Sequence, residues 1–156
     1  MIRSTRLPES DVLATLNNYV DRYPFISKLG VTAESYEDGT VQATVPYLEQ
    51  YGNPPDENVE APQELALHGG IVSSLLDTVM GFSSMAALLD DERTHGPTVS
   101  LDIDFVTAAT GPLDVVAEPV RIGSSTATIR GELLDQDTGE VVAVGQGVWR
   151  VYSPQD

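Results

Sequence analysis

The sequence contains no cysteine, so disulfides, thiol nucleophiles and zinc sites built on thiolates are all excluded. Basic residues are almost as scarce: 8 Lys and Arg stand against 24 Asp and Glu, which gives a formal net charge of −16. Lys28 is the only lysine. Because so little positive charge is available to neutralise phosphates, we expect neither nucleic-acid binding nor attachment to an anionic membrane surface.

The excess of acidic residues predicts a halophilic protein that works in a salt-rich cytoplasm. In dilute buffer the negative charges repel one another, whereas at 1 M salt the Debye length falls to about 3 Å and the repulsion is screened. The alternative is an ordinary acidic protein with no need for salt. Residues 1–11 contain no apolar signal core, which also favours a cytoplasmic location.

The length of 156 residues and a hydrophobic content of 41% are typical of one globular domain, so we expect residues 1–156 to form a single unit. Its first 24 residues or so predict a helical N-terminal extension. Apolar residues recur there at helical spacing, at Val12, Leu13, Leu16 and Val20. Ser10 or Asp11 is the expected helix cap, and Pro24 is the expected end.

The segment 71–89 predicts a long central helix, because apolar pairs recur every four residues and small residues fill the gaps. The preceding stretch, 47–66, shows no periodicity and is rich in proline and acids. A loop of this length is either a lid or wall of a site, or a plain surface excursion.

Alternating apolar and polar residues predict six strands, two before the central helix and four after it. They cover residues 31–36, 41–45, 98–105, 113–122, 126–134 and 141–152. Glu37-Asp38-Gly39 is a hairpin turn signal between the first two. Consecutive strands joined by short turns form an antiparallel sheet, against which the helix must bury itself, so the fold class is α+β.

Asp77 is the only ionisable residue between positions 71 and 89. A charge on so apolar a helix must be partnered, neutralised or placed against a cleft. It is therefore a candidate catalytic group, and the alternative is a structural carboxylate bonded to nearby hydroxyls. At the start of the helix, His68-Gly69-Gly70 exposes unencumbered N–H groups that suit a developing oxyanion, unless it is only an ordinary N-terminal turn.

The spacing of these two features has a consequence for assembly. Nine residues separate His68 from Asp77, which on one helix is a rotation of about 180° and a rise of roughly 13 Å. The two groups then cannot serve one reacting atom within a single chain. If they share a site, the carboxylate and the Gly69 N–H come from different subunits of a symmetric dimer. Thr98 and Ser100 offer hydroxyls on the next strand.

This pattern resembles the hotdog-fold acyl-CoA thioesterases, specifically the PaaI-like branch named for phenylacetic acid degradation. The matching residues are His68-Gly69-Gly70 and the segments 75–81, 99–106 and 108–113. The likeness extends over roughly residues 25 to 151. It implies a curved antiparallel sheet wrapped around a long central helix, and an enzyme that hydrolyses an acyl-CoA thioester.

The resemblance also implies roles for individual residues. Asp77 would be the general base or nucleophile, and the Gly69 N–H of the partner subunit would be the oxyanion donor. His68 would fix the turn and contact the thioester region. Thr98, or else Ser100, would position the water, and Gly70 would contact the substrate. No metal or cofactor is implied, since coenzyme A is part of the substrate, and the chain is expected to self-associate as a dimer or a dimer of dimers.

One position departs from the family pattern. Family members carry an Asn or similar residue about six positions before the histidine, where this chain has Pro62. Gln63, Asn58 and Asn53 are nearby but out of register. The departure favours one alternative function, a non-catalytic acyl-CoA or small-ligand binding protein on the same fold. A second alternative is an acyl-CoA hydratase, since related folds perform that chemistry. Such enzymes pair an Asp or Glu with a nearby His, and the position of His68 on a glycine turn disfavours that pairing.

Two arginines, Arg121 and Arg93, are candidates for binding the phosphates of coenzyme A. The alternative for each is an ion pair with surface acids. His95, in the sequence Arg93-Thr94-His95-Gly96, is expected to be a surface residue of a turn.

Overall fold

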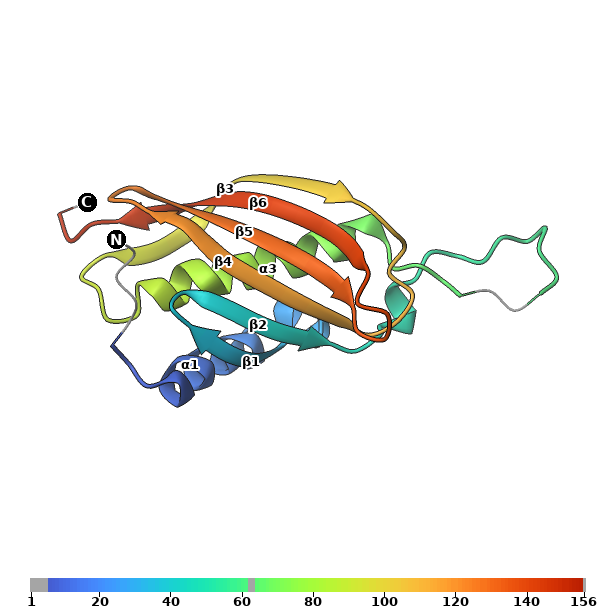
Figure 1. Cartoon of the computed structure of the whole chain (residues 1–156), viewed down its shortest axis with the longest axis horizontal. Helices are drawn as coiled ribbons and strands as arrows, with labels where there is room; N and C mark the ends of the chain where they lie inside the picture. The colour runs from blue at the N-terminus through green and yellow to red at the C-terminus, as the bar shows by residue number, and fades with distance from the viewer. Residues whose placement is uncertain (1–5, 62–63, 156) are drawn as a thin grey trace.

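The computed structural model describes residues 6–61 and 64–155. Its elements follow the order α1 (Glu9–Arg22), α2 (Pro24–Lys28), β1 (Thr32–Glu37), β2 (Thr40–Val45), the short 3₁₀ helix η1 (Glu49–Tyr51), α3 (Gly69–Ala87), β3 (Thr94–Phe105), β4 (Leu113–Ile122), β5 (Thr126–Asp135) and β6 (Val141–Tyr152). Figure 1 shows these elements along the chain.

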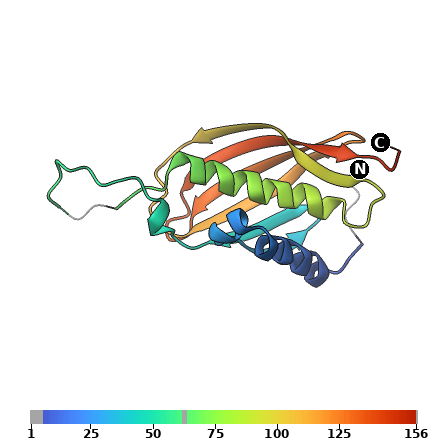
Figure 2. The ribbon, with the colours of Figure 1, turned by 180° about the vertical axis from the view of Figure 1, so that it is seen from behind.

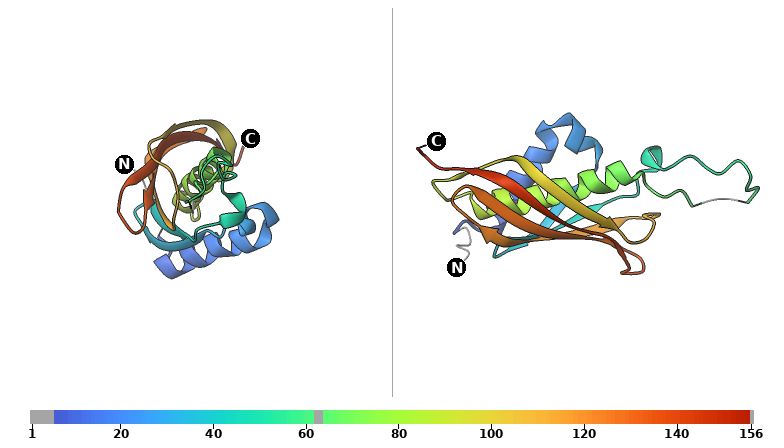
Figure 3. Two further views of the ribbon diagram at one scale, coloured as in Figure 1. Left: turned by 90° about the vertical axis from the view of Figure 1, so that its right-hand side faces the viewer. Right: turned by 90° about the horizontal axis from the view of Figure 1, so that it is seen from above.

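The six strands form one antiparallel sheet in the order β1-β2-β4-β5-β6-β3. The sheet curls around α3, which is seen end-on in Figure 3. Helix α1 lies beside α3 and along β1, so that it covers the open side of the curve (Figure 2). This arrangement confirms the predicted α+β fold, with a curved sheet wrapped around a long helix.

Helix α3 is apolar because the sheet covers most of its surface. Twelve of its 19 residues are buried. By length and composition alone it would be long and apolar enough to cross a membrane. In the fold it is the core helix, in contact with β2, β3, β4, β5 and β6, and this position explains its composition.

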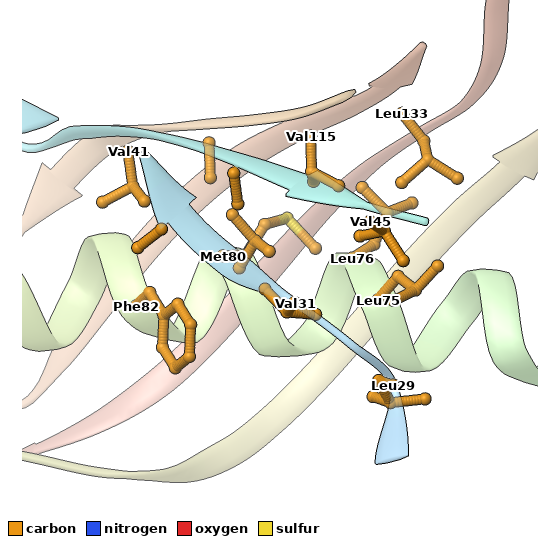
Figure 4. Close-up of a cluster of buried hydrophobic side chains, with 14 of the residues drawn as sticks. Leu29, Val31, Val41, Val45, Leu75, Leu76, Met80, Phe82, Val115 and Leu133 are labelled. Atoms are coloured by element: carbon orange, nitrogen blue, oxygen red, sulfur yellow. The ribbon is translucent and has the colours of Figure 1, made fainter. Parts of the chain in front are cut away.

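Leu76 and Met80 of α3 are fully buried and pack against the inward side chains of the sheet (Figure 4). The contact with β5 is close because Gly131 has no side chain there. A Cβ at that position would lie only 2.8 Å from Met80 Cγ. Side-chain volume at the centre of the molecule is therefore closely determined on both the helix and the strand.

The N-terminal helix begins earlier than the sequence predicted. Pro8 is its N-cap and no side chain caps it, so the expected cap at Ser10 or Asp11 is wrong. Its buried face holds the predicted Val12, Leu16 and Val20. After this helix, Pro24 opens the short helix α2 instead of only ending α1, because proline fits the first helical position.

The hairpin between β1 and β2 turns as predicted. Asp38 and Gly39 both have positive φ, 49° and 88°, as a type I′ turn requires. Strand β3, by contrast, begins four residues before the predicted start, since Gly96-Pro97 lies at an irregularity within the strand rather than before it. Proline is tolerated there because β3 is an edge strand with a bulge.

The aperiodic stretch before α3 contains η1 and then a loop that projects away from the sheet (Figure 1). Backbone pairing closes its base: Gly52 bridges Leu67, and Asn53 N–H donates to the Ala66 carbonyl at 2.7 Å. Among the described residues of this loop, none lines the pocket that contains Asp77 in the same chain. Pro62 and Gln63, where the family pattern has its upstream polar residue, lie outside the described residues.

Candidate functional site

A pocket of about 390 Å³ lies where α1, α3 and β3 meet. Asp77 and Thr98 are part of its wall, from α3 and β3 respectively. Aromatic rings make up much of the rest: Tyr19 from α1, Tyr23 from the junction of α1 and α2, Phe82 from α3 and Trp149 from β6. The pocket therefore combines one ionisable carboxylate with an apolar, ring-lined interior, which is typical of a site for a small organic group.

Asp77 is held by a hydroxyl of the neighbouring strand. Thr98 Oγ1 donates a hydrogen bond to Asp77 Oδ1 at 2.8 Å, which leaves the second carboxylate oxygen available to the pocket. Burial, Tyr23 and Asp77 together raise the pKa of the Tyr19 hydroxyl. Tyr19 therefore remains a neutral phenol beside the carboxylate at physiological pH.

His68 caps the N-terminus of α3 with its ring. His68 Nδ1 accepts a hydrogen bond from the Gly70 N–H at 2.9 Å, and the His68 carbonyl accepts one from Ile71. The Gly70 N–H is therefore already used in a hydrogen bond within its own chain. Within the described part of the chain, the Gly69 N–H makes no hydrogen bond, and it is the donor of this turn that remains free for a ligand.

The carboxylate and the free N–H lie apart within one chain. Eight residues along α3 correspond to a rise of about 12 Å, and neither Gly69 nor His68 lines the pocket of Asp77. A Cβ at Gly69 would lie 3.4 Å from the Phe105 ring, at the far end of β3. The geometry thus agrees with the inference from spacing that one chain cannot bring both groups to a single atom.

His95 is not the surface residue that the sequence predicted. It lines the pocket, and its Nδ1 lies 3.0 Å from the Oγ of Ser84, which is fully buried. Burial lowers the pKa of His95 to about 4. The prediction is wrong because Gly96-Pro97 indicated a turn, whereas β3 continues through it. The hydroxyl of Ser84 on an apolar helix was the one available sequence signal of a polar partner.

The remaining candidates lie away from the pocket. Ser100 and Arg121 are exposed, on β3 and β4. Arg93 binds both carboxylate oxygens of Asp91, at 2.8 and 2.6 Å, and donates to the Gly123 carbonyl at 2.7 Å. Its guanidinium thus ties the start of β3 to the turn between β4 and β5.

Strand β3 is an edge strand with an apolar surface. Val99 and Phe105 of the strand are 61% and 58% exposed, and Val106, which follows its last residue, is 55% exposed. An edge with apolar side chains and unpaired backbone groups is a template for pairing with another chain. In the described part of the chain, no group of three or more His, Asp or Glu side chains is placed to hold a metal ion.

Comparison with known proteins gives three kinds of match. The model of the Thioesterase superfamily matches residues 66–142. The Halobacterium salinarum protein named "Putative esterase VNG_1336C" is 31% identical over 153 residues, which cover 95% of this chain and 97% of that protein.

Solved structures of thioesterases have the same fold. The thioesterase HI1161 from Haemophilus influenzae superimposes with a TM-score of 0.75 at 16% identity, covering 100% of this chain and 98% of that one. Zebra fish Thioesterase Superfamily Member 2 gives 0.73 at 21% identity, with 92% and 98% covered. The hotdog architecture expected from the sequence is thereby confirmed.

Proposed function

The chain belongs to the thioesterase superfamily, and we propose that it hydrolyses acyl-CoA thioesters to a free acid and coenzyme A. The observation that carries the proposal is the position of Asp77. It is the only ionisable residue of α3, and it faces a pocket with one carboxylate oxygen already oriented by Thr98. The residues that resemble the PaaI-like branch favour that branch within the family.

Hydrolysis of a thioester needs a base or nucleophile and a place for the oxyanion. Asp77 would take a proton from water, and the resulting hydroxide would add to the thioester carbonyl. Collapse of the tetrahedral intermediate breaks the C–S bond, and the leaving thiolate recovers the proton from Asp77. Direct attack by the Asp77 carboxylate, giving a mixed anhydride that water then cleaves, is the other route that this residue permits.

The oxyanion donor in this proposal is the N–H of Gly69 of the partner subunit. The donor has no partner within the described part of its own chain, and the helix dipole adds partial positive charge to it. His68 contributes as a positioning residue, since its ring holds the turn by capping Gly70. The exposed apolar edge formed by β3 supports a dimer that would bring the two groups together.

Replacement of Asp77 tests the proposal. We expect Asp77→Asn and Asp77→Ala to abolish release of free thiol from acyl-CoA thioesters, measured with a thiol-trapping reagent in molar KCl. Both variants should keep the melting temperature and the oligomeric state of the wild type within narrow limits, because asparagine can still accept from Thr98 and alanine favours a helix.

Asp21→Asn is the matched control, because Asp21 is an exposed carboxylate on α1 outside the pocket. It should hydrolyse thioesters at the wild-type rate. Full turnover by both Asp77 variants would overturn the assignment. Binding of acyl-CoA by the wild type without any thiol release would favour the non-catalytic alternative instead.

A further inference from the structure

The pocket has two polar ends. Helix α3 and strand β3 both line it, and at each end one residue of α3 bonds to one residue of β3. At one end Thr98 donates to Asp77, and at the other His95 is bonded to Ser84. Ser84 follows Asp77 by seven residues, which corresponds to about 10 Å along a helix. His95 precedes Thr98 by three residues, and three residues of strand span at most about 10 Å. The two estimates agree, so His95 is too distant to exchange protons with Asp77 directly.

Two nitrogen atoms at the distal end have no hydrogen-bond partner within the described part of the chain. Among the described side chains, the Tyr36 hydroxyl is the one polar atom that is sealed from solvent without a hydrogen bond. In the same described set, neither the indole Nε1 of Trp149 nor the Nε2 of His95 has a hydrogen-bond partner, and neither atom is sealed from solvent. Both residues line the pocket. Trp149 is only 2% exposed, and its Nε1 lies on the side of the ring that faces Gly81, another residue of the pocket wall.

Gly81 keeps this indole nitrogen accessible. It lies on α3 between the two ends of the pocket, and a Cβ there would lie 3.4 Å from Trp149 Nε1. Phe82 and Met85, on the same helix, give the surrounding wall an apolar character. Two unpaired nitrogen atoms beside these apolar side chains disfavour a purely hydrocarbon occupant, because that occupant would leave both without a hydrogen bond.

We infer that His95 is a specificity-determining residue, which together with Trp149 forms a subsite for a neutral oxygen, a hydroxyl or a carbonyl, at the distal end of the acyl group. The inference rests on the proposed function for the position of the thioester beside Asp77. Trp149 donates to that oxygen, and His95 Nε2 donates or accepts according to its tautomer. Ser84 acts as a positioning residue that fixes the imidazole ring.

The charges around the subsite exclude a carboxylate as its ligand. Burial lowers the pKa of His95 to about 4, so the ring is neutral at physiological pH. Tyr19 of α1 and Tyr23, just after its end, line the pocket with phenol groups and no cation, and Asp77 at the other end repels anions. The preferred substrates are therefore hydroxyacyl and oxoacyl thioesters rather than dicarboxylic monothioesters.

A matched panel of thioesters tests the inference on the full-length protein in molar KCl. The panel contains ω-hydroxyacyl-CoA thioesters of four to eight carbons and the unsubstituted acyl-CoA of each length. For the chain length that spans the pocket, we expect kcat/KM of the wild type to favour the hydroxylated member about tenfold, which is the worth of one neutral hydrogen bond. In His95→Phe the ratio should fall to about one through loss on the hydroxylated member alone, and Ser84→Ala should give an intermediate ratio.

Met85→Leu is the control variant, because it changes the wall of the pocket without removing a polar atom. It should leave the ratio at the wild-type value even if it changes both rates. His95→Gln, which keeps a donor and an acceptor, should restore part of the preference and so separate loss of the hydrogen bond from a loss of folding.

A binding measurement keeps the inference distinct from the proposed function. Asp77→Asn should bind intact hydroxyacyl-CoA more tightly than the unsubstituted thioester, as measured by calorimetry, whether or not the wild type hydrolyses either one. Hydrolysis of the whole panel without any preference, or an unchanged preference in His95→Phe, would overturn the inference and leave the thioesterase assignment intact. Absence of thiol release together with a preserved binding preference would overturn the thioesterase assignment and leave the inference intact.

Discussion

Hydroxyl groups determine how the ionisable side chains of the pocket are held. Thr98 orients the carboxylate of Asp77, and Ser84 holds the ring of His95. In each pair the hydroxyl comes from one element and the ionisable group from the other, so the geometry depends on the register between α3 and β3. A shift of either element by one residue would separate both pairs.

The buried state of His95 predicts how stability depends on pH. Its pKa is lowered from 6.5 to about 4 in the folded protein, so between these values the unfolded chain binds more protons. The free energy of unfolding therefore has its full His95 contribution above about pH 6.5 and loses it as the pH falls toward 4. The difference corresponds to about 3 kcal/mol at most.

Urea unfolding of the wild type and of His95→Gln between pH 4 and 7 isolates this contribution from the many carboxylates. We expect the free-energy difference between the two proteins to shift against the wild type by up to about 3 kcal/mol as the pH is lowered. Parallel pH profiles for the two proteins would show that the ring is not buried in its neutral form.

At the level of elements, α3 is joined to the β1–β2 hairpin by a buried hydrogen bond. Ser83 Oγ donates to the Gly39 carbonyl at 2.7 Å, and Ser83 is fully buried. We expect Ser83→Ala to lower the free energy of unfolding by about 1–3 kcal/mol, because the carbonyl would be left buried and unpaired. Chemical denaturation at neutral pH measures the change.

Ser74→Ala is the matched control on the same helix. Among the described residues, Ser74 Oγ bonds only to the Gly70 carbonyl one turn earlier, and this hydrogen bond is exposed to solvent. Its replacement should change stability by no more than about 0.5 kcal/mol, since alanine is the better helix former. Equal losses in the two variants would mean that the bond to the hairpin contributes nothing specific.

At the scale of the whole molecule, the proposed site needs two chains, and mixing of inactive variants can show this. Gly69→Pro removes the free N–H, and proline suits this position because it is the first residue of α3 and His68 has φ −57° and ψ 137°. We expect the variant to lose about 100-fold or more in kcat. Gly69→Ala keeps the N–H and should retain most activity.

A heterodimer of Gly69→Pro and Asp77→Asn contains one intact site if the two groups come from different chains. Subunits unfolded together and refolded as an equal mixture should therefore regain about a quarter of the wild-type activity. Each variant refolded alone should stay inactive. A mixture that remains as inactive as its components would place both groups in one chain.

The net charge of −16 predicts a second property of the whole molecule. The Debye length falls from about 10 Å at 0.1 M salt to about 3 Å at 1 M, which screens repulsion between surface carboxylates. We expect the melting temperature to rise as KCl is increased from 0.1 M to molar concentrations. An uncharged osmolyte at equal osmolality serves as the control, and it should have a smaller effect. A flat or falling melting temperature in KCl would contradict the expectation.

Sequence periodicity determined the elements of this protein because burial imposes a local pattern on each of them. Alternation placed the strands β4, β5 and β6 within a residue of their bounds, and a lone charge on an apolar helix singled out Asp77, which lines the pocket. Spacing along one helix also indicated that His68 and Asp77 point apart. These features depend on residues close together in the chain.

The tertiary structure decided what depends on distant residues. Nothing near His95 in the sequence indicates burial, since its partner Ser84 belongs to another element and Trp149 comes from the last strand. The continuation of β3 through Pro97 likewise depends on its place at the edge of the sheet, where a missing N–H is tolerated. A local sequence pattern indicates whether a side chain is buried. Which residues surround that side chain is determined only when the sheet closes around the helix.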